Sequence, residues 1–219
     1  MTNILESIII PPKSGGKPKG LIVLLHGWGA DASDLASLAS LLNLPDFSFI
    51  FPNALYPYPY SSFGRAWYDL RNESFYEGLE DSQKVLTNWL LSLEENTGVP
   101  IERSLLGGFS QGGAMTLDVG FKLPFAGLIS MSGYLHPGAA EVKKISDENI
   151  QATTIAPPVL ITHGKQDTVV PITKAVNARD NLISQGVAVE YQEFDMGHEI
   201  SPEVLDTVQK FIKEIFKKS

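Results

Sequence analysis

The sequence predicts a three-layer α/β sandwich, in which a mostly parallel central sheet carries helices on both faces. Two observations support this fold class. Short apolar segments such as residues 21–25 lack the alternation of a half-exposed strand and are typical of buried parallel strands. Longer segments between them, for example residues 33–42, repeat their leucines at helical spacing. Buried strands that alternate with amphipathic helices are the pattern of α/β folds.

The expected elements follow one another along the chain. We expect strands at residues 21–25, 47–51, 104–109, 126–131, 158–162 and 187–194, and helices at residues 33–42, 73–96 and 172–184 and from Gln111 onward. A last helix begins after Ser201, a favoured N-cap residue, with Pro202 at its first position. The residues 11–20, rich in proline and glycine, form a hairpin or a loop. Residues 1–219 are therefore predicted to form one domain.

Composition excludes several classes of function. The chain has no cysteine, which removes disulfides, thiolate zinc sites and a cysteine nucleophile. A net charge of -8, with no basic cluster beyond the C-terminal lysines, argues against a nucleic-acid partner. The N-terminus has no basic leader, and no apolar segment is long enough to span a bilayer. We therefore expect a cytoplasmic protein that does not insert into membranes.

The most specific motif is Gly108-Phe109-Ser110-Gln111-Gly112, between a predicted strand and a predicted helix. In a nucleophile elbow the serine lies at a strained strand-to-helix turn, and the flanking glycines are needed because side chains there would collide with neighbouring segments. The alternative is an ordinary glycine-rich turn, and the strand and helix on either side favour the elbow. Ser110 is therefore the candidate nucleophile.

A serine hydroxyl needs a general base, which is usually histidine. His198 lies in the loop between the last strand and the last helix, where an α/β-hydrolase presents its base. His26 and His163 each end a strand, and we interpret them as turn residues whose rings hydrogen-bond to the backbone. His136 is interpreted as a loop residue without a catalytic role. His198 is therefore the candidate base.

The third member of a serine-histidine-carboxylate triad should follow a strand between the other two in chain order. Asp167 does so, because it lies in the loop after the strand at residues 158–162. The alternative is a turn or helix-capping aspartate. The order Ser110, Asp167, His198 is the one that the α/β-hydrolase fold requires.

Ester hydrolysis also needs donors for the oxyanion that forms on the attacked carbonyl. In this fold one backbone amide comes from the residue after the nucleophile, here Gln111. The other comes from a glycine-rich loop after an early strand, here His26-Gly27-Trp28-Gly29, and we assign it to Trp28. The indole ring of Trp28 can equally form a wall of the substrate pocket.

These motifs together resemble the phospholipase/carboxylesterase family, which includes bacterial carboxylesterases and acyl-protein thioesterases. The matching segments are 25–29, 66–69, 108–115, 163–167 and 197–198. The resemblance implies the α/β-hydrolase fold and a compact esterase that needs neither metal nor cofactor and is often a homodimer.

One segment departs from the family pattern. Residues 52–64 alternate tyrosine with proline and are expected to form a long irregular loop. Tyr58, Phe63 and Trp67 are candidate substrate-binding residues here, although Trp67 can equally be plain core packing. The chain has no room for a separate lid domain, so we expect a shallow groove for short to medium acyl esters.

Two alternatives to a carboxylesterase stay open. Thioesterase or lysophospholipase activity would use the same residues on another acyl substrate. A catalytically silent member of the fold would bind a small molecule or a protein. Such a relative would be expected to have lost a triad residue, and none is missing here.

Overall fold

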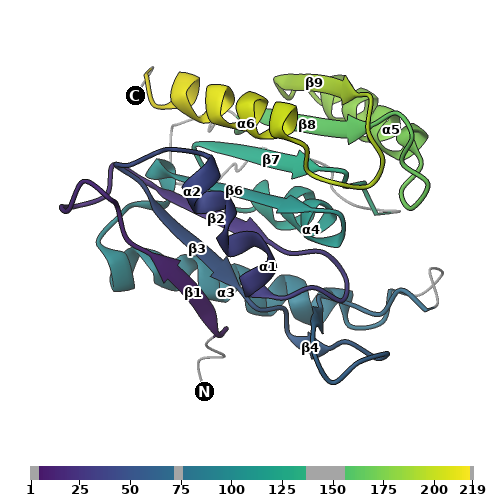
Figure 1. Ribbon diagram of the computed structural model, residues 1–219, viewed down its shortest axis with the longest axis horizontal. Coiled ribbons are helices and arrows are strands. Elements are labelled where there is room, and N and C mark those ends of the chain that lie inside the picture. Colours follow the sequence, from purple (N-terminus) through teal and green to yellow (C-terminus); the bar gives the residue numbers. More distant parts are fainter. Residues whose placement is uncertain (1–4, 72–75, 137–155, 218–219) are drawn as a thin grey trace, which may run out of the picture.

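The computed structural model describes residues 5–71, 76–136 and 156–217 and confirms the predicted α/β-hydrolase architecture. Within these residues the main sheet has the order β1-β3-β2-β6-β7-β8-β9 (Figure 1). Only β1 is antiparallel to its neighbour, β3, so all the other strands end at one edge of the sheet. The strands are β1 (Ser7–Ile10), β2 (Leu21–Leu25), β3 (Ser48–Pro52), β6 (Ser104–Phe109), β7 (Gly127–Met131), β8 (Val159–Gly164) and β9 (Val189–Phe194).

Helices cover both faces of this sheet (Figure 1). On one face pack α3 (Leu79–Thr97), α4 (Gln111–Gly120) and α5 (Ile172–Ser184), and on the other α1 (Ala32–Ala36), α2 (Leu38–Leu41) and α6 (Pro202–Ile215). Strand β2 shows why the predicted strands are continuously apolar, because its side chains alternate between two covered faces of the sheet. Val23 lies on the face covered by α3, α4 and α5, and Ile22 on the face covered by α1, α2 and α6. No helix in the described part of the chain is long and apolar enough to cross a membrane.

Two predicted helices were wrong in extent. The helix expected at residues 33–42 is two short helices, because the carbonyl of Ser37 accepts hydrogen bonds from both the amide (3.1 Å) and the hydroxyl (2.8 Å) of Ser40. The helix expected at 73–96 begins only at Leu79. Gly78 precedes it in a left-handed conformation, with φ 87°, which a continuing helix cannot contain. Residues 73–75 of that prediction lie outside the described ranges.

The two loop predictions are also refined. Residues 11–20 form a loop and not a hairpin, because β1 pairs with β3 and does not pair with β2. The tyrosine-proline segment, residues 52–64, is not irregular throughout. Pro52 ends β3, and β4 (Tyr56–Pro57) pairs antiparallel with β5 (Arg65–Ala66). The expected absence of a lid depends partly on the segment between Met131 and Pro158. Most of this segment lies outside the described residues.

Candidate active site

Four loops that begin at the same edge of the sheet form the candidate site. His26 follows β2, Ser110 follows β6, Asp167 follows β8 and His198 follows β9. These strands are parallel, so their carboxyl ends lie together although the residues are far apart in sequence. The fold thus brings together the three residues predicted to act on the substrate.

Ser110 has a strained backbone, with φ 55° and ψ -117°. A non-glycine residue in such a region costs about 1–3 kcal/mol, which the surrounding structure must offset. The Ser110 amide donates to the carbonyl of Met131 at 2.9 Å, which ties the turn to the end of β7. A Cβ on Gly108 would collide with the backbone of Gly112, and one on Gly112 with the carbonyl of Leu25. The glycines of the motif are therefore required by close backbone packing.

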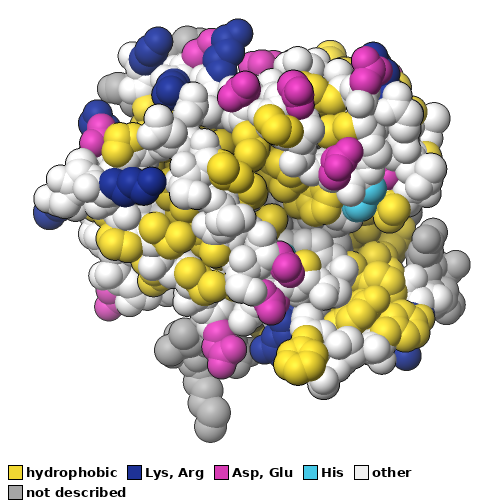
Figure 2. Space-filling view, in the orientation of Figure 1, with side chains coloured by type: hydrophobic (Ala, Val, Ile, Leu, Met, Phe, Trp, Pro, Cys, Tyr) yellow, Lys and Arg dark blue, Asp and Glu magenta, His cyan; other side chains and the backbone are white. Residues whose placement is uncertain are grey.

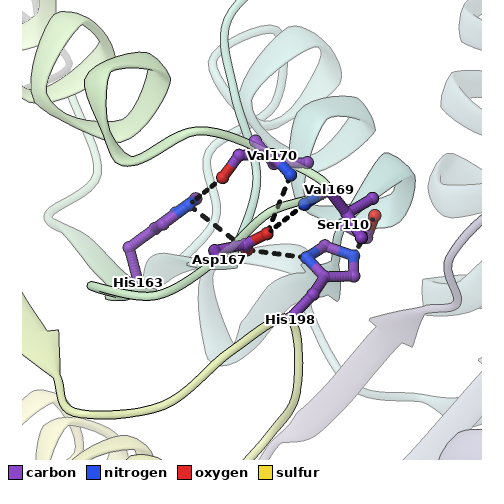
Figure 3. Close-up of polar contacts among 6 residues, drawn as sticks. All are labelled: Ser110, His163, Asp167, Val169, Val170 and His198. Atoms are coloured by element: carbon purple, nitrogen blue, oxygen red, sulfur yellow. Dashed lines mark hydrogen bonds and ion pairs between the residues drawn. The ribbon is translucent and has the colours of Figure 1, made fainter.

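The side chains of Ser110, His198 and Asp167 are connected by hydrogen bonds (Figure 3). His198 Nε2 lies 2.9 Å from Ser110 Oγ, and His198 Nδ1 lies 2.7 Å from Asp167 Oδ2. A carboxylate only accepts, so Nδ1 carries the proton and the lone pair of Nε2 faces the serine hydroxyl. This tautomer is the one that can accept a proton from Ser110.

Asp167 is buried, and the carboxylate oxygen that does not face His198 is held by backbone amides. Its Oδ1 accepts hydrogen bonds from the amides of Val169 (2.9 Å) and Val170 (2.8 Å). These two donors stabilise the ionised carboxylate and leave Oδ2 directed at His198 (Figure 3).

His198 lies partly exposed at the mouth of the site. Its ring packs on Phe109 with the ring centroids 4.8 Å apart, so the first variable residue of the Gly-x-Ser-x-Gly motif supports the histidine. Figure 2 shows a histidine side chain at the surface beside grouped hydrophobic side chains. His26, His136 and His163 are buried, whereas the side chain of His198 is 16% exposed. The proposed base is therefore accessible from the surface.

The segments that carry the two predicted oxyanion donors lie next to the serine. Gln111 is the first residue of α4, so its amide is one of those that a helix leaves unpaired. The loop that carries Trp28 lies against the serine, since a Cβ on Gly27 would be 3.4 Å from Ser110 Cβ. Among the described residues, the Trp28 amide donates to no backbone carbonyl outside the helices and strands. The segments that carry the predicted donors therefore adjoin the serine on two sides.

The side chain of Gln111 has a structural role that the sequence reasoning missed. Its Oε1 accepts from the amide of Trp67 at 3.0 Å, and its Nε2 donates to the carbonyl of Tyr68 at 2.8 Å. Gln111 is completely buried. The sequence did contain a signal for this role, because Gln111 is a large polar residue followed by the small residues Gly112, Gly113 and Ala114 in a buried helix. These bonds join the nucleophile turn to the segment after β5.

Trp67 completes this connection. Its indole Nε1 donates to the carbonyl of His26 at 3.0 Å, and its own carbonyl accepts from the hydroxyl of Ser82. The side chain has no exposed surface and belongs to the hydrophobic core. Of the two interpretations of Trp67, the structure therefore favours core packing over a wall of the substrate pocket.

Trp28, in the loop that lies against Ser110, belongs to a cluster of aromatic rings. The ring of Trp28 makes edge contacts with Tyr58 (5.1 Å between centroids) and Tyr60 (5.9 Å). Tyr60, which the sequence reasoning did not single out, is 66% exposed. Phe63 is 82% exposed and is in none of the described ring contacts, so it stands apart from this group. Trp28, Tyr58 and Tyr60 are hereafter called the aromatic wall.

The remaining histidines lie inside the protein. The predicted ring-to-backbone bonds are confirmed, since His26 Nδ1 donates to the carbonyl of Gly27 (2.8 Å) and His163 Nε2 to that of Val170 (2.8 Å). His136 lies in a loop, as predicted, and its side chain is buried, with Nδ1 2.7 Å from Asp118 Oδ2. The described residues contain no cluster of three or more His, Cys, Asp or Glu side chains able to hold a metal ion.

An α/β-hydrolase sheet with an activated serine at its nucleophile elbow defines the class of serine hydrolases. The comparisons place the chain within that class. Residues 6–216 match the family model described as Phospholipase/Carboxylesterase, and the chain belongs to this family.

Known proteins of two kinds resemble the chain over most of its length. Acyl-protein thioesterase 1 of Gibberella zeae is 32% identical over 208 residues, which cover 86% of this chain and 84% of that protein. The crystal structure of esterase PE8 is 33% identical, covers 97% of this chain and 99% of its own, and has a TM-score of 0.82. A carboxylesterase from Mesorhizobium loti shares the fold alone, with 15% identity, a TM-score of 0.81 and 97% coverage of both chains.

The buried His26 predicts a pH dependence of stability. Burial lowers the pKa of His26 from its ordinary value of 6.5, and its Nε2 accepts a hydrogen bond from the amide of Ala54 (3.0 Å), which requires the neutral ring. The unfolded chain takes up this proton more readily, so the free energy of unfolding decreases as pH falls below about 6.5. We expect His26→Gln, which can still accept from Ala54 but does not titrate, to lose less Tm than the wild type between about pH 7.5 and pH 5.5. Identical losses of Tm in thermal unfolding would contradict this assignment.

Proposed function

We propose that Ser110 is the nucleophile, His198 the general base and Asp167 the residue that orients and stabilises His198. One observation carries this proposal. A serine held at the elbow lies 2.9 Å from His198 Nε2, while Nδ1 of the same ring lies 2.7 Å from a buried carboxylate. These distances are within the range for proton transfer from the hydroxyl to the ring.

The geometry supports a two-stage hydrolysis. As Ser110 Oγ attacks the substrate carbonyl, His198 Nε2 accepts the hydroxyl proton and then donates it to the departing alkoxide or thiolate. The acyl group is left on Ser110. Water then repeats the sequence, with His198 again as the base, and the acid is released. Asp167 stabilises the positively charged ring in both stages because it stays ionised.

The oxyanion of each tetrahedral intermediate would be bound by the amides of Trp28 and Gln111. The N-terminus of α4 adds the positive end of a helix dipole at this point. Preorganised donors of this kind contribute about 3–4 kcal/mol each to lowering the barrier. The bonds from the Gln111 side chain to Trp67 and Tyr68 hold the first turn of that helix in place.

We propose that the substrates are carboxylic esters with short to medium acyl chains. The aromatic wall includes Trp28 of the loop that lies against Ser110, and part of the wall is open to solvent, since Tyr60 is 66% exposed. Such a wall binds the first methylenes of an acyl chain at about 0.8 kcal/mol each and gains nothing from those that extend into water.

Acyl thioesters are the second candidate substrate. The relatives named acyl-protein thioesterase 1, including the one from Gibberella zeae, favour this alternative. The same residues would act on both substrates, and a thiolate leaves more readily than an alkoxide. Substrate comparison therefore decides between the two.

Replacement of the serine tests the proposed nucleophile. We expect an alkyl fluorophosphonate to label the wild type at Ser110, because only an activated serine reacts readily with phosphorus. Ser110→Ala should lose both the label and the hydrolysis of p-nitrophenyl esters, whereas Ser61→Ala, at an exposed serine of the tyrosine-proline segment, should keep both. Peptide mapping by mass spectrometry locates the label. Labelling that persists in Ser110→Ala would overturn the assignment.

Acyl length tests the proposed substrate. We expect kcat/KM for p-nitrophenyl esters to rise over the first few methylenes, by about fourfold for each one fully buried, and then to level off or fall. Matched acyl thioesters measured in parallel identify the preferred leaving group. A steady rise to long acyl chains, or a large preference for thioesters, would favour the thioesterase alternative.

A further inference from the structure

His163 lies behind the proposed triad and has not been given a role in it. It stands near the end of β8, four residues before Asp167, and its side chain is completely buried. Figure 3 shows its ring directed at the turn that carries Asp167.

The Nε2 atom of His163 faces two acceptors on this turn. It lies 2.8 Å from the carbonyl oxygen of Val170 and 3.4 Å from Oδ2 of Asp167 (Figure 3). Both acceptors lack protons, so Nε2 must carry one and donate it. The main hydrogen bond goes to Val170, and the carboxylate oxygen lies close enough to be stabilised by the same N–H dipole.

The contact with Val170 bears directly on the carboxylate. The amide of Val170 donates to Asp167 Oδ1 at 2.8 Å, while its carbonyl is held by His163. Val170 is thus held on one side by His163 and holds Asp167 on the other. Asp167 Oδ2, which His163 also faces, is the atom that bonds to His198.

A histidine that only filled space at this position would destabilise the fold. Its Nδ1 is buried without a hydrogen-bond partner among the described residues. Burial of an unpaired polar atom destabilises a fold, and an aromatic or aliphatic ring substitute would avoid that cost. What the histidine supplies and a hydrocarbon does not is the Nε2–H donor.

We propose that His163 is a positioning residue, whose Nε2–H holds the turn from Asp167 to Val170 so that Oδ2 stays aligned with His198. The inference rests on the proposed function of the triad. His163 contacts neither Ser110 nor the substrate position in this arrangement and acts only through Asp167. It adds a second histidine, from inside the fold, to the carboxylate that orients the first.

Three substitutions separate the donor from the space that the ring fills. His163→Phe keeps an aromatic ring without the donor, and His163→Leu removes both ring and donor. His163→Gln keeps an amide N–H near the position of Nε2. Thermal unfolding establishes which variants are folded, and kcat and KM are measured on a p-nitrophenyl ester. The proton resonance of the His198 Nδ1–H to Asp167 hydrogen bond is recorded by NMR.

We expect the folded donor-free variants to lose kcat by roughly tenfold or more, as for a lost hydrogen bond near a charged group, with little change in KM. Their His198 Nδ1 proton resonance should shift or broaden, because Oδ2 is less well oriented. His163→Gln should keep the resonance and recover most of kcat. Recovery of this kind in His163→Gln supports the donor role even if His163→Phe does not fold, because His163→Leu supplies the comparison.

Either of two results would overturn the inference. One is a folded His163→Phe or His163→Leu with the kcat and the resonance of the wild type. The other is an equal loss of kcat in all folded variants, including His163→Gln, together with a His198 Nδ1 proton resonance at its wild-type position. That combination would mean that His163 has only a structural role. Wild type and Ser110→Ala, labelled with fluorophosphonate in parallel, test the triad separately, since a wild type that is not labelled at Ser110 contradicts the proposed function itself.

Discussion

A serine with φ 55° remains in place only where tight packing on every side compensates for its strain. At Ser110 this packing comes from Gly108 and Gly112, which let β6, α4 and the end of β2 approach closely. The strain also turns the hydroxyl outward to His198 and sets the N-terminus of α4 beside it. The glycine pattern and the geometry of the site therefore depend on one backbone conformation.

Hydrogen bonds between segments distant in sequence stabilise the structure around the Ser110 turn. Gln111 bonds to Trp67 and Tyr68, and Trp67 in turn bonds to His26 in the loop that carries Trp28. Both segments that carry proposed oxyanion donors are thus linked through one buried tryptophan. Such links preorganise donors before substrate arrives, which is what makes them effective in catalysis.

The features predictable from the sequence were those with local causes. The strand-turn-helix setting of Ser110 and the N-cap at Ser201 depend on neighbouring residues, and both agree with the structure. The role of the Gln111 side chain could not be predicted, since its partner Trp67 is 44 residues away. For the same reason the contact of the loop residue His136 with Asp118 on α4, which lies inside the protein, was not predicted. The prediction of one continuous helix at residues 33–42 was wrong for a different reason. The leucine spacing does not reveal that the Ser40 hydroxyl donates to the carbonyl of Ser37.

The most direct test of this account is a crystal structure of the protein after reaction with an alkyl fluorophosphonate, whose tetrahedral phosphorus resembles the proposed intermediate. We expect phosphorus bonded to Ser110 Oγ, with the phosphoryl oxygen about 2.7–3.1 Å from the amide nitrogens of both Trp28 and Gln111. The alkyl group should lie along the aromatic wall. An adduct on another residue, or a phosphoryl oxygen turned away from both amides, would contradict it.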